Sequence, residues 1–459
     1  MTFRNSKNRF RFAKLSFSLL MPLALNASVN AMTLTEAVEL AWSNDPTYLA
    51  AKASLHVSYE RTNEAVAGLL PQLTVSANTT ANLREYNQHT QPPPAVASPI
   101  ERFNSNSAQL NLTQPLWKRS STIAMTQANF ALGQAKYQLN AAAQDLLIKL
   151  AQAWFDVMQA RDGTMPAEAQ VRVAQQQLEV SQRGYDKGVL SLTELEDAHA
   201  KYEQAIAEHA AAQSELEIKL ATLEQIIGPV SLIPPVLVDQ FASPKFDSNS
   251  LEEWLTQAEE HNPTLLAAQM ALYVANEEIR KQRAGHEPTF DLVASYTRSA
   301  QDVGISGGQL GFDSRQTAVG LHFNMPLYAG GGQSAKVREA LAQCYKAEQE
   351  LEAARRNARL AAKQAWFTLR VSQVREASGL KSVQSTALAL KGEQSARTRG
   401  LKANHDVLKA QQQNAVALRD WRKARYDTIL SQIKLKAACG QLTSDDLEVL
   451  DKALITGQE

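Results

Sequence analysis

The sequence predicts a mainly α-helical protein with a small β part, built as two tandem structural repeats. Three patterns lead to this fold class. Long alanine-rich runs carry apolar residues at helical spacing, four shorter stretches alternate apolar and polar residues, and the same order of features occurs twice. Each repeat is expected to hold two amphipathic β-strands and one long α-helical hairpin, so the chain has four strands in all.

Residues 1–31 are typical of a secretory signal peptide. A basic start is followed by the apolar run Leu15–Leu25 and the small-residue site Val29–Ala31. A membrane anchor is the weaker alternative, because the apolar run is well short of the roughly 20 residues that a spanning helix needs. No cysteine follows the signal to carry a lipid, and no later stretch is apolar enough for a transmembrane helix. The protein is expected to be exported, and strands are the only elements with which it could span a membrane.

The composition gives no support for a strongly charged partner. The 459 residues include 47 basic and 47 acidic side chains, so the usual electrostatic case for nucleic-acid binding is missing. The two cysteines, Cys344 and Cys439, fall in helical runs without a CxxC motif, and unpaired packing is favoured over a disulfide.

Each repeat is expected to begin with two helices. Thr33 and Glu36 form a capping-box pattern, and Asn44-Asp45-Pro46 then interrupts the helix. The same events recur 217 residues later with Ser250, Glu253 and His261-Asn262-Pro263. The predicted organisation is a signal peptide at 1–31, a first repeat at 32–228, a linker at 229–249, a second repeat at 250–442 and a C-terminal tail at 443–459.

Strands are expected at about 72–83, 106–116, 289–298 and 316–326, where the period becomes two. The last strand should stop at Pro326, and the glycines Gly330–Gly332 should form a corner before the next helix. An apolar face of this kind could cover a soluble core or face lipid. Because the protein is expected to be exported and carries no other membrane element, the interpretation that this face contacts lipid is favoured. The residues expected to face lipid are Leu73, Val75, Leu110, Leu112, Phe290, Leu292, Leu321 and Phe323.

The helical hairpins are expected to project from the strands. In the first repeat a helix from about Ser121 to Ala160 should turn at Arg161–Pro166 and return to Gly228, with a break near Gly184–Ser191. The corresponding turn of the second repeat is expected at Gln373–Leu380. An ordinary soluble coiled coil is the alternative, but it leaves the strands at the base of each hairpin unexplained.

No pattern indicates an enzyme, a cofactor or a metal site. The loops 84–106 and 298–315 are polar, and the second contains Gly304–Gly308, which matches a GxSxG motif. That motif serves catalysis only on a turn from a strand to a helix, whereas here it lies between two hairpin strands. The eight histidines are scattered and form no HExxH motif.

Four strands cannot close a barrel, and an open edge in lipid leaves backbone groups unpaired. Two chains would give eight strands, whose interior is filled by side chains, whereas three would give twelve strands and room for a lumen. A trimer would also place twelve long helices around the same axis. The sequence therefore favours a homotrimeric, water-filled conduit.

The chain resembles the TolC-type outer-membrane factors, in their non-lipidated branch. The residues that carry the resemblance are Asn44–Pro46 and its copy, Pro326–Gly331, Gly400, Asp406–Ala410 and Gln432–Gly440. Their order and duplication cover essentially the whole mature chain. The resemblance implies a twelve-stranded barrel in the outer membrane, continuous with a helical tunnel across the periplasm. It also implies docking to a periplasmic adaptor and an inner-membrane pump, such as an ABC transporter, for type I protein secretion or small-molecule efflux.

The same resemblance implies that the periplasmic tips gate the tunnel and contact the adaptor. Ser378–Leu380 is similar to a tip contact of the family, although a plain helix turn explains it as well. The resemblance also implies a ring of aspartates at the gate, but no matching pair of aspartates occurs near residues 373–380. The predicted tip residues are Arg161, Asp162, Gln373, Arg375, Glu376, Ser378, Gly379 and Leu380. A soluble periplasmic helical scaffold is the alternative function, and the cargo is not encoded in any of these patterns.

Overall fold

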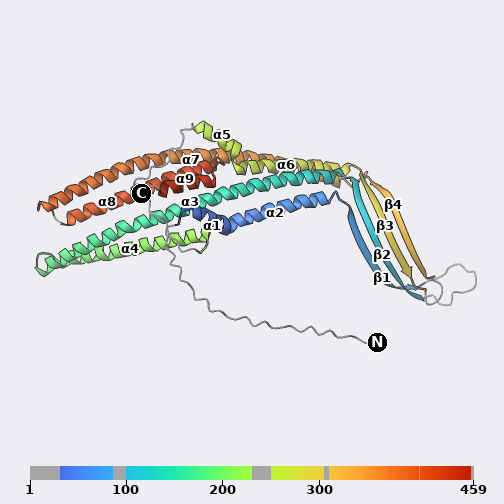
Figure 1. Ribbon diagram of the computed structural model, residues 1–459, viewed down its shortest axis with the longest axis horizontal. Helices are drawn as coiled ribbons and strands as arrows, with labels where there is room; N and C mark the ends of the chain where they lie inside the picture. Colours follow the sequence, from blue (N-terminus) through green and yellow to red (C-terminus); the bar gives the residue numbers. More distant parts are fainter. Residues whose placement is uncertain (1–31, 86–99, 230–249, 304–309, 403, 456–459) are drawn as a thin grey trace, which may run out of the picture.

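The computed structural model describes residues 32–85, 100–229, 250–303, 310–402 and 404–455. The molecule is elongated, with a sheet at one end and the turns of two long helical hairpins at the other (Figure 1). This arrangement of long helices and four antiparallel strands confirms the predicted fold class. The predicted signal peptide, the predicted linker from residue 230 onward and the GxSxG motif lie outside the described residues.

The order of elements is the same in both halves of the chain. The first half contains α1 (Leu34–Asn44), α2 (Pro46–Ala67), β1 (Gln72–Glu85), β2 (Ile100–Trp117), α3 (Arg119–Asp186) and α4 (Leu192–Ile227). The second contains α5 (Leu251–His261), α6 (Pro263–Arg283), the 3-10 turn η1 (Ala284–His286), β3 (Thr289–Gln301), β4 (Phe312–Asn324), α7 (Gly332–Thr398) and α8 (Asn404–Ala438). Helix α9 (Ser444–Ile455) follows, within the segment for which the sequence predicted only a tail.

Side-chain caps fix the start of the first two helices in each half. The Thr33 hydroxyl accepts from the Glu36 amide and the Glu36 carboxylate accepts from the Thr33 amide, which completes the predicted capping box of α1. The Ser250 hydroxyl caps α5 by accepting from the Glu253 amide. Prolines Pro46 and Pro263 occupy the first turn of the following helices, where a missing N–H costs nothing.

The asparagines at the α1–α2 and α5–α6 corners join the two ends of each repeat. The Asn44 side-chain amide donates to the Ile227 carbonyl at the end of α4, at 2.7 Å. In the second half, Asn262 donates to the Ala438 carbonyl at the end of α8, at 2.9 Å. The Asn262 side-chain oxygen also accepts from two amides at the start of α6, a role that Asp45 fills in the first half. These bonds satisfy carbonyls that a helix end leaves without partners.

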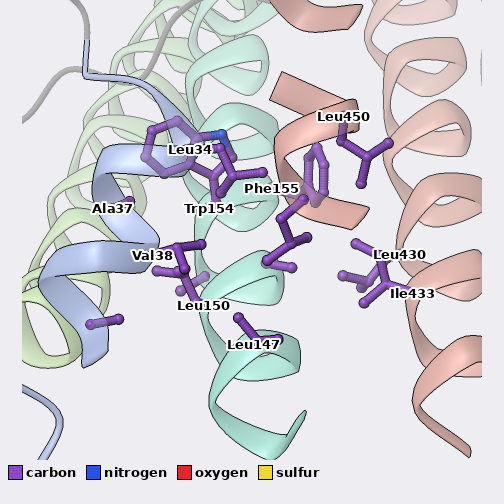
Figure 2. Packing of buried hydrophobic residues seen from close by; sticks show 14 of the residues in the cluster. Leu34, Ala37, Val38, Leu147, Leu150, Trp154, Phe155, Leu430, Ile433 and Leu450 are labelled. Carbon is purple, nitrogen blue, oxygen red and sulfur yellow. The ribbon is translucent and has the colours of Figure 1, made fainter. Parts of the chain in front are cut away.

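The main hydrophobic core lies where α1, α3, α4, α8 and α9 meet (Figure 2), and α1 and α9 lie midway along the molecule (Figure 1). Trp154 of α3 is fully buried there, between Leu34 of α1 and the α8–α9 side. Asp451 of α9 closes this core, because its carboxylate accepts from the Leu34 amide at 3.0 Å and from the Thr35 hydroxyl at 2.9 Å. The last described helix therefore caps the first described helix.

All four strands are longer than predicted, and the polar loops are correspondingly shorter. The strands pair in the order β1-β2-β3-β4, all antiparallel. Pairing of β1 with β2 extends to Glu85 opposite Ile100, and pairing of β3 with β4 extends to Gln301 opposite Phe312. The sequence missed these ends because polar residues occur on both faces near the loops, which hides the period of two although the ladder of backbone hydrogen bonds continues.

The predicted turns at Arg161–Pro166 and Gln373–Leu380 are wrong, because α3 and α7 pass straight through both segments. At 1.5 Å per residue, the 68 residues of α3 span about 100 Å. The chain reverses instead between Asp186 and Leu192, and again between Thr398 and Asn404. The first of these reversals is the segment in which the sequence predicted only a break. None of the described helices is both long and apolar enough to cross a membrane.

Tertiary contacts explain why the helices continue. Pro166 removes one backbone hydrogen bond, a loss of roughly 3 kcal/mol in a helix interior. It is nevertheless buried, and Asp162 one turn earlier is held by two side chains of α8. Gly379 is helical, and a Cβ atom there would lie 3.2 Å from the Trp421 side chain. Gly379 therefore permits close helix packing and does not mark a turn.

Both cysteines are free and buried, which confirms the favoured expectation of unpaired packing. Burial raises the pKa of the Cys439 thiol to about 12. This thiol donates to the Trp254 carbonyl of α5 at 3.4 Å. Cys439 thus behaves as a small apolar residue of the second, smaller core.

The glycine after α8 supports a sharp prediction. Gly440 has a φ of 74°, and a Cβ atom there would lie 2.1 Å from the His261 carbonyl oxygen. Gly188 has a similar φ of 69° with no atom within 4 Å of such a Cβ. We expect Gly440→Ala to lower the free energy of unfolding by roughly 3 kcal/mol or more, and Gly188→Ala by only about 1 kcal/mol. Thermal unfolding of both variants measures the difference, and equal losses would show that the contact with His261 is unimportant.

Candidate functional site

The apolar residues of the sheet lie on one face. In the register of the strands, Leu73 is opposite Leu112 and Val75 is opposite Leu110. Leu110 and Leu112 in turn stand opposite Tyr296 and Ala294. On the other side of β3, Phe290 pairs with Phe323 and Leu292 with Leu321, and the two phenyl rings lie 5.0 Å apart. Side chains of directly opposed residues point to the same side of a sheet, so all eight predicted positions share one face.

The opposite face of the sheet is polar. Its residues include Thr74, Ser76, Gln109, Asn111, Ser295, Thr297, Gln316 and His322, all at alternate positions to the apolar set. Neither face is covered by another part of the described chain along β4, since every residue of that strand is exposed, and on the apolar face Val75 and Leu321 remain 75% and 73% exposed. The two uncovered faces of this sheet therefore need different surroundings, apolar for one face and polar for the other.

The sheet has two unpaired edges, and each strand leads directly into a helix. Among the described residues, β1 and β4 are the outermost strands and pair on one side only. Helix α2 runs into β1, β2 into α3, η1 connects α6 to β3, and β4 leads through the glycine corner into α7. The helices pack side by side in the matching order α2-α3-α6-α7 (Figure 1). The layer of strands is thus continued by a layer of helices.

Each hairpin turns on a glycine with positive φ, followed by an exposed aliphatic side chain. In the first turn these residues are Gly188 and Val189, and in the second they are Gly400 and Leu401. Lys402 lies 3.7 Å from the Glu393 carboxylate and 4.0 Å from that of Asp406, so partly exposed ion pairs hold the second turn. We call the segments 187–192 and 399–402 the tips.

A capping box fixes the first tip. The Ser191 backbone amide and hydroxyl both donate to the Glu194 carboxylate at 2.8 Å, and the Ser191 hydroxyl accepts from the Glu194 amide. These hydrogen bonds lower the pKa of Glu194 below its ordinary value. The start of α4 is therefore stabilised by an ionised carboxylate at the positive end of the helix.

None of the eight predicted tip residues lies at a tip. Arg161 and Asp162 lie near the middle of α3. The other six occupy the middle of α7, where Gly379 packs on Trp421 and Leu380 is 40% exposed. Of these residues, Asp162 takes part in a buried contact between the two hairpins.

Asp162 is the centre of a polar cluster that joins α3 to α8. Its carboxylate accepts from the Arg422 guanidinium at 2.9 Å and from the Tyr426 hydroxyl at 2.7 Å. The Tyr426 ring stacks on Phe155 with centroids 5.7 Å apart. Burial, and then the nearby Asp162 charge, raise the pKa of Tyr426 well above its ordinary value, so this phenol stays protonated as a donor.

A second series of hydrogen-bonded polar side chains crosses the same interface nearer the core. Lys219 of α4 donates to the Asp156 carboxylate at 2.9 Å, and Gln152 donates to the other oxygen of that carboxylate at 2.8 Å. Lys434 of α8 donates to the Gln152 side chain at 3.0 Å. Helices α4, α3 and α8 are thus linked through hydrogen bonds as well as through apolar packing.

A bare amphipathic sheet that continues into a layer of long helices defines one segment of the wall of a membrane conduit. The chain matches the profile of the family described as "Outer membrane efflux protein" over residues 37–229 and 254–441, and it belongs to that family. This is a family of outer-membrane channels, so the protein is an outer-membrane protein with a long periplasmic part. The match favours the channel over the soluble scaffold.

Relatives and solved structures agree with this assignment. The chain is 27% identical to outer membrane protein TolC of Escherichia coli, over 95% of this chain and 89% of that protein. It is 28% identical to the proteases secretion protein PrtF of Dickeya chrysanthemi, over 92% and 90% of the two chains. The fold is similar to the CmeC outer membrane channel of Campylobacter jejuni, with a TM-score of 0.72 at 17% identity over 97% and 98% of the two chains.

The cluster around Asp162 supports a prediction on stability. Asp162→Ala would remove the buried carboxylate that accepts from both the Arg422 guanidinium and the Tyr426 hydroxyl, so we expect a loss of roughly 3 kcal/mol in the free energy of unfolding and a clear fall in Tm. Asp197→Ala is the control, because Asp197 pairs with Lys201 within α4 and both side chains are more than 60% exposed. That exposed pair is expected to contribute only about 0.5 kcal/mol. Equal shifts in Tm for the two variants would contradict a structural role of the buried cluster.

The first tip is expected to loosen at acid pH. Because the pKa of Glu194 is lowered in the folded tip, its stabilisation is complete above the ordinary glutamate pKa of about 4.3 and is lost as the pH falls through the lower folded value. Hydrogen exchange at the start of α4, corrected for intrinsic rates, should show less protection at pH 3 than at pH 7. Glu194→Gln should remove this pH dependence, and its persistence in that variant would assign it to another group.

Proposed function

We propose that three copies of this chain form a continuous conduit, with a twelve-stranded barrel in the outer membrane and a helical tunnel below it. The observation that carries the proposal is the four-stranded sheet with two unpaired edges and two bare faces of opposite character. Its apolar face suits lipid and its polar face suits a water-filled lumen. The eight apolar positions described above are the proposed lipid contacts.

The direction of the edge strands supports closure by further copies. β1 runs away from the helices and β4 runs back towards them, so β4 of one copy and β1 of the next would pair antiparallel. Two copies would give eight strands and a filled interior, whereas three leave room for a lumen. The outer helices of the helical layer, α2 and α7, also carry exposed apolar side chains, including Val57 and Tyr59 on α2 and Tyr345 and Phe367 on α7.

The proposed role in the cell is export, by type I secretion of proteins or by efflux of small molecules. Relatives named for protease secretion and for efflux support both cargo classes. The conduit would work with a periplasmic adaptor and an inner-membrane pump, which would supply the energy and choose the cargo. We place the adaptor contact and the gate at the two tips, 187–192 and 399–402, which lie farthest from the sheet (Figure 1).

Membrane fractionation followed by native mass determination tests this proposal. We expect the full-length protein to appear in the outer-membrane fraction, to require detergent for extraction, and to have the mass of three mature chains. A monomer or dimer released by osmotic shock without detergent would overturn the barrel. A trimer that forms no conducting channel in a planar bilayer, even after the tips are removed, would contradict an open lumen.

A further inference from the structure

Two arginines stand opposite each other on the apolar face of the sheet. Arg298 of β3 pairs in register with Arg315 of β4, one step beyond the row that contains Tyr296 and Thr317. Their position in the alternation places both side chains on the same face as Leu292 and Leu321. This pair is the boundary at which the apolar part of β3 and β4 ends.

The position of the pair along the strands sets its depth in the membrane. The strands leave the helices at Thr289 and Asn324, so Arg298 and Arg315 lie on the half of the sheet farthest from the helices. With the helices in the periplasm, that half belongs to the outer leaflet. Arginine on the lipid face is strongly unfavourable at the bilayer midplane and nearly neutral at the interface. The pair is therefore expected at the level of the outer lipid headgroups.

The charge of this site is only partly neutralised within the chain. Arg298 forms an ion pair with Asp313 at 3.3 Å, and both side chains are more than half exposed. Among the described residues, Arg315 has no ion-pair partner. Like charges directly opposite each other destabilise a sheet unless a counter-ion lies between them. On this face of β1, the strand proposed to adjoin β4 of another copy, residues 73–83 carry no carboxylate, and Glu85 lies at the far end of the strand, opposite Ile100.

We propose that Arg298 and Arg315 bind the phosphate group of a lipid headgroup in the outer leaflet. Each guanidinium presents a planar fork of N–H donors that can bind two phosphate oxygens. Asp313 neutralises only one of the two positive charges, and the remaining positive charge attracts an anion. The acyl chains of the same lipid would lie along the rows that contain Tyr296, Val319 and Leu321, directly below the arginines. The proposal rests on the proposed function, because it requires this face to contact lipid.

The test uses the detergent-extracted trimer of the full chain, titrated with lipid A, a glycolipid that carries phosphate on its sugar headgroup. Binding is followed by native mass spectrometry and by the rise in Tm. We expect lipid A to bind about tenfold more tightly than the same lipid after removal of its phosphates, in line with the loss of charge-assisted hydrogen bonds. The double variant Arg298→Gln, Arg315→Gln should lose this preference while remaining a trimer.

Arg84→Gln is the matched control, because Arg84 lies on the polar face of β1, and this variant should keep the preference. An unchanged preference in the double variant would overturn the proposal. The proposal would also be overturned if millimolar inorganic phosphate competed for the site as effectively as lipid A does. The site would then bind any phosphate and would not be specific for a lipid. The starting material is already a trimer, so failure of lipid binding is distinguishable from failure of the conduit itself.

Discussion

The unpaired backbone of β1 and β4 is the constraint on which the rest of the structure depends. In hydrocarbon each backbone group without a hydrogen-bond partner costs several kcal/mol, so a four-stranded sheet with open edges cannot stay in a membrane alone. Because each strand of the sheet leads into its own helix, pairing the edges of neighbouring sheets also brings α7 of one copy beside α2 of the next. The same contact between neighbouring copies therefore closes both the barrel and the helical layer.

The hairpins are held unevenly along their length. The main core surrounds Trp154, and the polar cluster at Asp162 lies roughly 65 Å along α3 from its sheet end, at 1.5 Å per residue. Beyond these contacts the packing becomes sparse: no residue of α7 after Ser372 is buried, and the buried residues of α3 after Pro166 are Ala174 and Ser181. Few buried contacts mean low local stability, so the ends of the hairpins are the parts that can move with the least loss of free energy.

Sequence patterns predicted the faces of the strands well and the turns of the hairpins poorly, for physical reasons. A period of two fixes which side chains share a face, so Leu73 and Leu112 could be assigned from their neighbours alone. Pro166 was misread as a turn because a proline in a helix is tolerated only where tertiary packing offsets its cost, and the partners of Asp162 are 260 and 264 residues away. The signal that could have located the tips was the pair Gly188 and Gly400, which occupy equivalent positions and have positive φ.

The duplication is imperfect in a way that gives the two hairpins different attachments. Helix α9 adds Leu447 and Leu450 to the core of the first half, and Asp451 caps α1, whereas α5 is capped by Ser250 alone and packs in a core of six buried residues. The second hairpin is nevertheless tied to the larger core through one helix, since Ile429 and Ile433 of α8 are buried there and Arg422 reaches Asp162. Helix α7 has no such link to that core. Any separation of the second hairpin from the first must therefore break the contacts of α8 with α3, including the hydrogen bonds that the buried Asp162 carboxylate accepts from Arg422 and Tyr426.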